Sequence, residues 1–92
     1  MVDPYRIETT PNFERGFKRL DPAIARRIIS KVEQLAAHPE AHAQPLRNLP
    51  PDLAGLWKCR LGDYRVLFWQ DDSRQVITLY AVAHRSTIYK HL

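Results

Sequence analysis

Hydrophobic and polar positions alternate near the start of the chain and then change to a helical period. Tyr5, Ile7 and Thr9 alternate with charged residues, which predicts a short, half-buried strand. The two phenylalanines and the last leucine of residues 11–20 are spaced i, i+4 and i+7, so they share one face of a predicted helix. The aliphatic residues of 22–37 repeat in the same way and predict a second helix.

Both predicted helices begin with the same two-residue signal. Thr10-Pro11 and Asp21-Pro22 each place a capping residue directly before a proline, which is favoured at the first helical position. The second signal also ends the first helix. The short junction between the helices predicts an antiparallel helical hairpin.

Residues 38–54 are polar and contain four prolines, so they predict a connection without regular structure. We expect it to lie against the body through its three leucines, Leu46, Leu49 and Leu53. Three β-strands are predicted after it, at residues 55–61, 64–70 and 75–84. The predicted fold is a single α+β domain spanning 1–92, in which an N-terminal strand and a helical hairpin precede a three-stranded antiparallel meander. One sheet packs on the two helices, and a short C-terminal tail follows.

The Gly62-Asp63 pair suits a two-residue turn, which fixes the register of the first two strands of the meander. In this register Arg60 opposes Arg65, and side chains alternate between the two faces of the sheet. One face carries the apolar residues that can cover the helices: Trp57, Cys59, Leu61, Tyr64, Val66 and Phe68. The other face carries three cations near the turn and apolar residues at the far end: Lys58, Arg60, Arg65, Leu56, Leu67 and Trp69.

The pairing of Arg60 with Arg65 needs an explanation, because like charges placed directly opposite each other destabilise a sheet. One interpretation is that both side chains splay into water, or that a carboxylate such as Asp63 neutralises them. The other is that the pair, together with Lys58, forms a site for a polyanion. The net charge of +4 is compatible with a nucleic acid or an acidic protein as the partner.

The end of the chain supplies further polar chemistry. The last predicted strand leads directly into His84-Arg85, and Tyr89 follows four residues later. Strand alternation places His84 on the same face as Tyr80. His84 and Tyr89 are candidate site residues, although an ordinary exposed histidine and simple packing of the tail explain the same two residues.

Metal and cofactor chemistry find little support in the sequence. His38 and His42 have the i, i+4 spacing of zinc ligands on a helix, but Pro39 lies between them in a predicted loop and no third ligand is evident. Cys59 points to the core in the predicted register, so a catalytic thiol is not expected. The sequence contains neither a phosphate-binding glycine loop nor a nucleophile elbow. We therefore expect neither a metal nor a cofactor.

Composition and the first residues narrow the cellular compartment in which we expect the protein. The chain has one cysteine, which excludes an intramolecular disulfide and favours a reducing compartment. The first ten residues lack the basic-then-apolar order of a signal peptide, and no apolar run approaches the roughly 18 residues of a membrane span. We expect a cytoplasmic protein with no membrane partner.

The runs GLWKCRLGDYRVLF and AHRSTIY, together with the preceding helical hairpin, resemble the RelE/ParE superfamily of toxins from bacterial and archaeal toxin–antitoxin pairs. The resemblance spans nearly the whole chain, and the family fold is the architecture predicted above. RelE-type members cleave messenger RNA inside the translating ribosome by driving the ribose 2′-hydroxyl onto the adjacent phosphate. ParE-type members inhibit DNA gyrase and lack a matched set of catalytic side chains.

The resemblance favours the RelE-type branch, because five residues fall on the basic and aromatic positions that its nucleases use: Lys58, Arg60, Arg65, Arg85 and Tyr89. Arginine stays protonated, so the three arginines are expected to bind phosphate and to stabilise the transition state without a metal. The general base is left open between Lys58, since neighbouring cations lower the pKa of a lysine, and His84, since histidine exchanges protons near neutral pH. Arg60 departs from the family pattern, where the best-studied type has a lysine, and His84 resembles the C-terminal histidine of other branches.

The resemblance also implies partners. We expect a cognate antitoxin, the ribosome and mRNA, with a monomeric free toxin and a hetero-oligomeric toxin–antitoxin complex. Two alternatives are left open. One is a ParE-like gyrase inhibitor, and the other is a non-catalytic relative that uses the same basic surface to bind RNA or an antitoxin.

Overall fold

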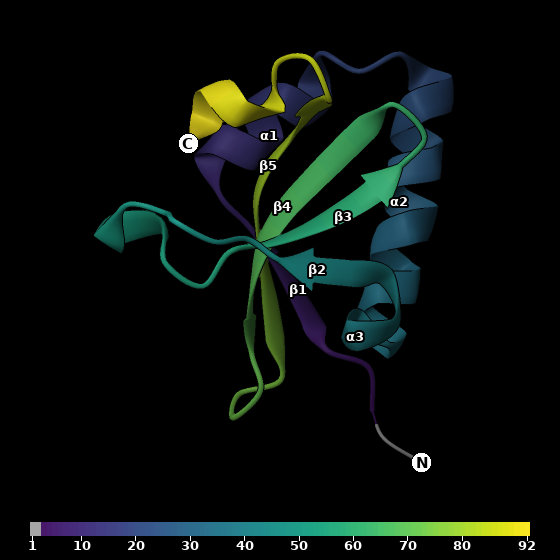
Figure 1. The fold of residues 1–92 in the computed structure, drawn as a ribbon. Coiled ribbons are helices and arrows are strands. Elements are labelled where there is room, and N and C mark those ends of the chain that lie inside the picture. The colour runs from purple at the N-terminus through teal and green to yellow at the C-terminus, as the bar shows by residue number, and fades with distance from the viewer. Residues whose placement is uncertain (1–2) are drawn as a thin grey trace.

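The computed structural model describes residues 3–92 as a five-stranded sheet with two helices on one face (Figure 1). The strand order is β1-β5-β4-β3-β2; β1 is parallel to β5, and the other pairs are antiparallel. The predicted α+β class is confirmed. In chain order the elements are β1 (Arg6–Thr9), α1 (Pro11–Lys18), α2 (Pro22–Ala37), α3 (Pro39–His42), β2 (Ala43–Pro45), η1 (Pro51–Leu53), β3 (Trp57–Leu61), β4 (Tyr64–Asp71), β5 (Val76–His84) and η2 (Ile88–His91).

The expectation of a connection without regular structure at 38–54 was wrong, because this segment contains α3, β2 and η1. Strand β2 pairs with β3 and adds a fifth strand at the edge of the sheet. It is only three residues long and ends in Pro45, which an edge strand tolerates because one side needs no donor. A strand this short shows no alternating pattern in the sequence. The leucines of the segment do pack against the body, as expected.

The start of α1 follows the predicted capping chemistry. The backbone N–H of Phe13 donates to Thr10 Oγ1 at 3.1 Å, and Pro11 occupies the first turn. Asp21 lies at the cap position of α2, but its side chain makes no capping hydrogen bond. In the middle of α1, a Cβ atom on Gly16 would lie 2.6 Å from the carbonyl oxygen of Val82. Helix α1 therefore approaches β5 more closely than any larger residue at position 16 would allow.

Both helices pack on the side of the sheet that we call the helix face. The core between the helices and the sheet is formed by buried residues of α1, α2, β3, β4 and β5: Phe13, Ile28, Val32, Leu35, Cys59, Val66, Phe68, Ile77, Leu79 and Val82. This is the apolar face that the sequence assigned to the helices. Among residues 3–92, no helix is long and apolar enough to cross a membrane.

A smaller core lies on the opposite side of the sheet, which we call the second face. Its buried members come from the segment before β3, from β4 and β5, and from the tail: Leu53, Leu56, Leu67, Ala81 and Ile88. Two hydrogen bonds hold the cover of this core in place. Trp69 Nε1 donates to the carbonyl of Ala54 at 3.0 Å, and the Tyr80 hydroxyl donates to the carbonyl of His91 at 2.8 Å.

Candidate functional site

The β3–β4 hairpin has the register that the sequence predicts. Lys58 pairs with Leu67 and Arg60 pairs with Arg65, on either side of the Gly62-Asp63 turn. Cross-strand partners share a face of the sheet. Because Leu67 belongs to the core of the second face, Lys58 and Arg60 lie on that face as well.

The opposed arginines differ in their surroundings. Arg60 is exposed, whereas Arg65 is only 6% exposed. Arg65 Nη1 donates to the carbonyl oxygens of Gly62 and Tyr64, each at 2.8 Å. The interpretation in which both guanidinium groups splay into water therefore does not hold for Arg65. The guanidinium group of Arg65 folds back onto the turn, where two carbonyl oxygens solvate its charge. This separates it from the guanidinium group of Arg60.

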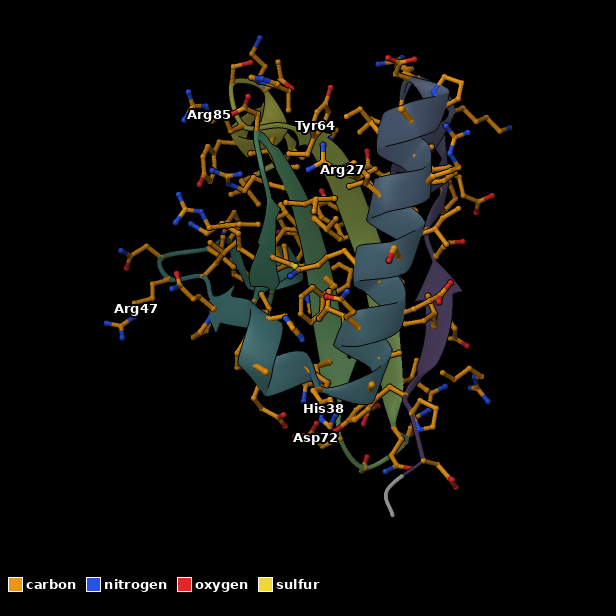
Figure 2. The ribbon with its side chains drawn as sticks, turned by 90° about the vertical axis from the view of Figure 1, so that its right-hand side faces the viewer. Arg27, His38, Arg47, Tyr64, Asp72 and Arg85 are labelled. Carbon is orange, nitrogen blue, oxygen red and sulfur yellow. The ribbon has the colours of Figure 1, made fainter. Side chains whose placement is uncertain are left out.

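Asp63 does not neutralise this pair, because it faces Arg85. The Arg85 Nε atom lies 3.6 Å from Asp63 Oδ1, and the backbone N–H of Arg85 donates to the Asp63 carbonyl at 2.7 Å. Both side chains are well exposed, so the ion pair itself contributes little stability. The backbone bond fixes the start of the C-terminal tail against the hairpin turn. Arg85 and Tyr64 lie at the same end of the molecule, opposite the end that carries Asp72 (Figure 2).

A surface hollow of about 440 Å³ lies beside Lys58 and Arg60, where α3 leads into β2. We call it the basic hollow. The remaining polar side chains that line it are two bases, one amide and one carboxylate: Lys31, His42, Gln44 and Glu40. Lys31 Nζ lies 3.4 Å from His42 Nδ1. Sequence reasoning missed Lys31 and Gln44 and considered His42 only as a zinc ligand, because it did not detect α3 and β2.

A β-bulge reverses the expected position of His84. The pairing of β4 with β5 slips between Leu67 and Phe68, and Tyr80 is the extra residue in β5. Tyr80 packs on the second face, where its ring lies 5.2 Å from that of Trp69. His84 pairs with Tyr64 and meets its ring edge-on at 5.5 Å, on the helix face. The prediction that His84 and Tyr80 share a face was therefore wrong.

The tail presents Tyr89 outward. Ile88 is fully buried in the core of the second face, while the adjacent Tyr89 is 51% exposed. The hydrogen bond from Tyr80 to His91 fastens the far end of η2. Simple packing therefore accounts for Ile88 but not for Tyr89.

Two further kinds of chemistry were considered from the sequence, a reactive thiol and a metal site. Burial raises the pKa of the Cys59 thiol, which holds it in the protonated form that is a poor nucleophile. Within residues 3–92, no three His, Cys, Asp or Glu side chains gather closely enough to hold a metal ion.

Comparison with known proteins gives one consistent result. The sequence model of the family described as ParE toxin of type II toxin-antitoxin system, parDE, matches residues 7–89. Toxin RelE of Mycobacterium tuberculosis is 35% identical over 88 residues, which cover 95% of this chain and 88% of that protein. Toxin RelG of the same organism is 31% identical over 88 residues, which cover 95% and 98%.

Solved structures agree with the sequence matches. A chain of the toxin-antitoxin complex RelBE2 from M. tuberculosis superposes with a TM-score of 0.82 and 29% identity, over 94% of this chain and 97% of that chain. The isolated E. coli RelE toxin has the same fold, with a TM-score of 0.69 and 17% identity over 96% and 99% of the two chains. The chain therefore belongs to the RelE/ParE superfamily and is a toxin of the type II toxin–antitoxin class.

Proposed function

We propose that this toxin is a metal-independent endoribonuclease that cuts mRNA within the translating ribosome. The observation that carries the proposal is the basic hollow, into which Lys58 and Arg60 open from one face of β3. Its four bases face a single carboxylate, so the hollow favours a polyanion. Its volume of about 440 Å³ suits a nucleotide-sized group.

The reaction needs a base, an acid and a group that stabilises the charged phosphorane. In our assignment neutral Lys58 takes the proton of the ribose 2′-hydroxyl, and the 2′-oxygen bonds to the adjacent phosphorus. The bond from phosphorus to the 5′-oxygen then breaks, and that oxygen receives a proton. The products are a cyclic 2′,3′-phosphate and a free 5′-hydroxyl. Arg60 and Arg85 stay protonated throughout and offset the developing negative charge.

His42 is the second proton-transfer group of the basic hollow. Its Nδ1 faces the Lys31 ammonium, which only donates, so Nδ1 accepts and the ring proton resides on Nε2. In this tautomer Nε2–H offers a hydrogen bond to the leaving 5′-oxygen; transfer of the proton itself requires the imidazolium form, in which Lys31 turns away from Nδ1. His84 was the other candidate, but it lies on the helix face, across the sheet from Lys58.

Arg65 and Tyr89 take supporting roles in the proposal. Arg65 is a positioning residue, because its hydrogen bonds to Gly62 and Tyr64 hold the turn to which Arg85 is attached. Tyr89 is exposed on η2 and offers an aromatic surface on which a splayed base can stack.

The proposed partners are an antitoxin, the ribosome and mRNA. An antitoxin is supported by the solved RelB–RelE complexes of E. coli and of the archaeon Pyrococcus horikoshii, whose toxin chains superpose on this one with TM-scores of 0.70 and 0.71. An acidic antitoxin segment over the basic hollow would block access to Lys58 and Arg60. We propose a free monomer and a hetero-oligomeric complex with the antitoxin.

The test is cleavage of a defined message on programmed ribosomes by the purified toxin. Lys58→Ala and Arg60→Ala should each slow cutting by about 10²–10⁴-fold, the usual contribution of such groups. Arg26→Ala, on the exposed side of α2, is the matched control and should cut normally. A message with a 2′-deoxy sugar at the cut site should stay intact. Cutting of that message, or normal cutting by Lys58→Ala, contradicts the mechanism.

Variants of the histidines and of Arg65 distinguish residues that take part in the reaction from residues that only position others. His42→Gln should slow cutting, whereas His84→Gln should leave the cleavage rate on the bound message unchanged. Arg65→Ala should lower both the melting temperature and the cutting rate, because it leaves two turn carbonyls without a donor. Arg60→Ala should lower the cutting rate alone.

A ParE-like gyrase inhibitor is the second candidate, because the family model that matches residues 7–89 is that of the ParE toxin. The same purified protein added to gyrase and supercoiled DNA distinguishes the two. Accumulation of gyrase–DNA cleavage complexes, with intact messages on ribosomes, would replace the nuclease proposal with this one.

A further inference from the structure

A second basic hollow, of about 430 Å³, lies on the helix face between α1 and the C-terminal tail. We call it the α1 hollow. Six nitrogen-bearing side chains line it: Asn12, Arg15, Arg19, His84, Lys90 and His91. Among the described residues that line it, none is acidic. It is separate from the basic hollow, which opens beside β3 at the other edge of the sheet.

The position of α1 is what builds this hollow. Arg15 and Arg19 are one helical turn apart, so they project on the same side of α1. Gly16 lets the helix backbone approach the Val82 carbonyl, where a Cβ atom would lie only 2.6 Å away. The two arginines are thereby held beside the end of β5, opposite the tail residues Lys90 and His91.

The hydrogen bonds of the two histidines turn both rings into donors toward the hollow. His84 Nδ1 accepts the backbone N–H of Ser86 at 3.1 Å, so the ring proton resides on Nε2. Asn12 Nδ2 donates to the Tyr80 carbonyl at 2.9 Å, which fixes the orientation of the amide. The same nitrogen lies 3.3 Å from His91 Nδ1, which must therefore accept, and its proton also resides on Nε2. Either ring would donate to an anion whether neutral or charged.

We infer that the α1 hollow binds a backbone phosphate of an RNA strand, at a distance along the strand from the phosphate that is cut. This inference rests on the proposed nuclease function. Donors reach the hollow from α1, from β5 and from the tail, so they converge from three directions. A backbone phosphate arranges its two charged oxygens and two ester oxygens tetrahedrally and so accepts hydrogen bonds from all three directions, whereas the two oxygens of a carboxylate accept mainly in one plane. The substrate strand is then held on both sides of the sheet.

Inorganic phosphate is the first probe, followed in the imidazole NMR signals of His84 and His91. Both signals should shift and saturate in the wild-type protein. The shifts should be lost in the double variant Arg15→Gln with Arg19→Gln. The matched control, Arg26→Gln with Arg74→Gln, removes the same charge from exposed positions elsewhere and should titrate like the wild type. An absence of saturable shifts in the wild type would overturn the site.

A 2′-O-methylated RNA oligonucleotide, which cannot be cut, is the second probe. The logarithm of its affinity falls with the logarithm of salt concentration, by about 0.7 for each phosphate neutralised on a single strand. The Arg15/Arg19 double variant should lose about that much slope, and the control variant should lose none. An unchanged slope, or a mononucleotide that binds as tightly as the oligonucleotide, would overturn the assignment to a strand.

Two comparisons separate this inference from its rivals. A polyglutamate peptide that binds through Arg15 and Arg19, where RNA does not, would assign the hollow to an acidic protein and overturn the inference. Lys58→Ala should slow cutting as stated above yet leave the phosphate titration unchanged. Failure of the nuclease proposal therefore shows on the ribosome, and failure of the phosphate site shows in the titration.

Discussion

The two faces of the sheet are built from the same strands but differ in what covers them. The helix face is covered by α1 and α2, and its core includes Ile28, Leu35 and Phe68, all fully buried. The second face is covered by two short 3-10 segments and their flanking loops, with Leu67 and Ile88 at its centre. Regular helices give continuous cover, whereas short segments leave part of the strands open. Lys58 and Arg60 occupy that open part.

This difference separates two demands on a small domain. A chain of 92 residues buries a modest core and has little stability in excess. Placing cations inside the helix face would cost that core directly, since unpaired buried charge is expensive. The second face accepts them near the turn, where one arginine is solvated by carbonyls and the others reach water. The interior of the helix face is thus kept apolar, and the cations of the two hollows lie either on the second face or at the open end of the helix face, beside α1.

The largest expected effect comes from the helix face. Phe68→Ala removes a fully buried ring and should lower the free energy of unfolding by about 3–5 kcal/mol. For a domain of typical stability this is a large fraction of the total. Urea unfolding followed by circular dichroism measures it. A loss below about 1 kcal/mol would show that the helix core carries less of the stability than its burial indicates.

Ile88→Ala tests the second face in the same way. By its chemistry the change costs about 2–5 kcal/mol, and we expect the lower end, because a surface tail can collapse into the space. The effect should be local. Hydrogen exchange should speed up in η2 and near Leu53 while α2 keeps its protection. Uniform loss of protection across both faces would show that the two cores unfold as one unit.

Gly16→Ala gives an effect whose sign is diagnostic. In an open helix, alanine in place of glycine stabilises by roughly 0.5–1 kcal/mol. Here the new Cβ would meet the Val82 carbonyl at 2.6 Å, so the helix must move and we expect a loss of about 1–3 kcal/mol. Thermal unfolding measures it, with Arg15→Ala on the exposed side of α1 as the control. A stabilised Gly16→Ala protein would mean that α1 shifts freely on β5.

The smallest effect concerns the end of the sheet away from the cations. The Tyr5 hydroxyl donates to Asp72 Oδ1 at 2.7 Å, which lowers the pKa of that carboxyl and raises the pKa of the tyrosine. A lowered carboxyl pKa contributes stability above its unfolded value of about 3.9, and that contribution is lost as the pH falls through the folded value. Tyr5→Phe should therefore flatten the acid limb of stability against pH. Because Asp72 is exposed, the change should be smaller than the three above; an unchanged acid limb would show that the bond does not persist in solution.

Sequence reasoning succeeded where a local rule fixes the geometry. A two-residue turn sets a hairpin register, so the pairing of Arg60 with Arg65 followed from Gly62-Asp63. A capping threonine before a proline similarly fixed the start of α1. Both rules involve residues close together in the chain.

The features that the sequence did not predict depend on contacts that no local rule describes. Strand β2 exists because β3 offers it a free edge, not because its own residues alternate. Arg65 is buried because two carbonyls of its own turn can solvate it. The basic hollow went undetected for the same reason, since Lys31 and His42 come beside Lys58 and Arg60 only when α2 and α3 meet β3 in the folded chain.

The bulge at Tyr80 adds a side chain to the second face without changing the face of any residue that follows it. Leu79 already pairs with Phe68 and Ala81 with Leu67, so deleting Tyr80 would restore strict alternation and leave His84 on the helix face. The deletion would instead remove the tyrosine that packs on Trp69 and holds the end of η2. A one-residue insertion in a strand can therefore give one face of a small domain a new anchor for its tail while the polar residues of the other face stay in place.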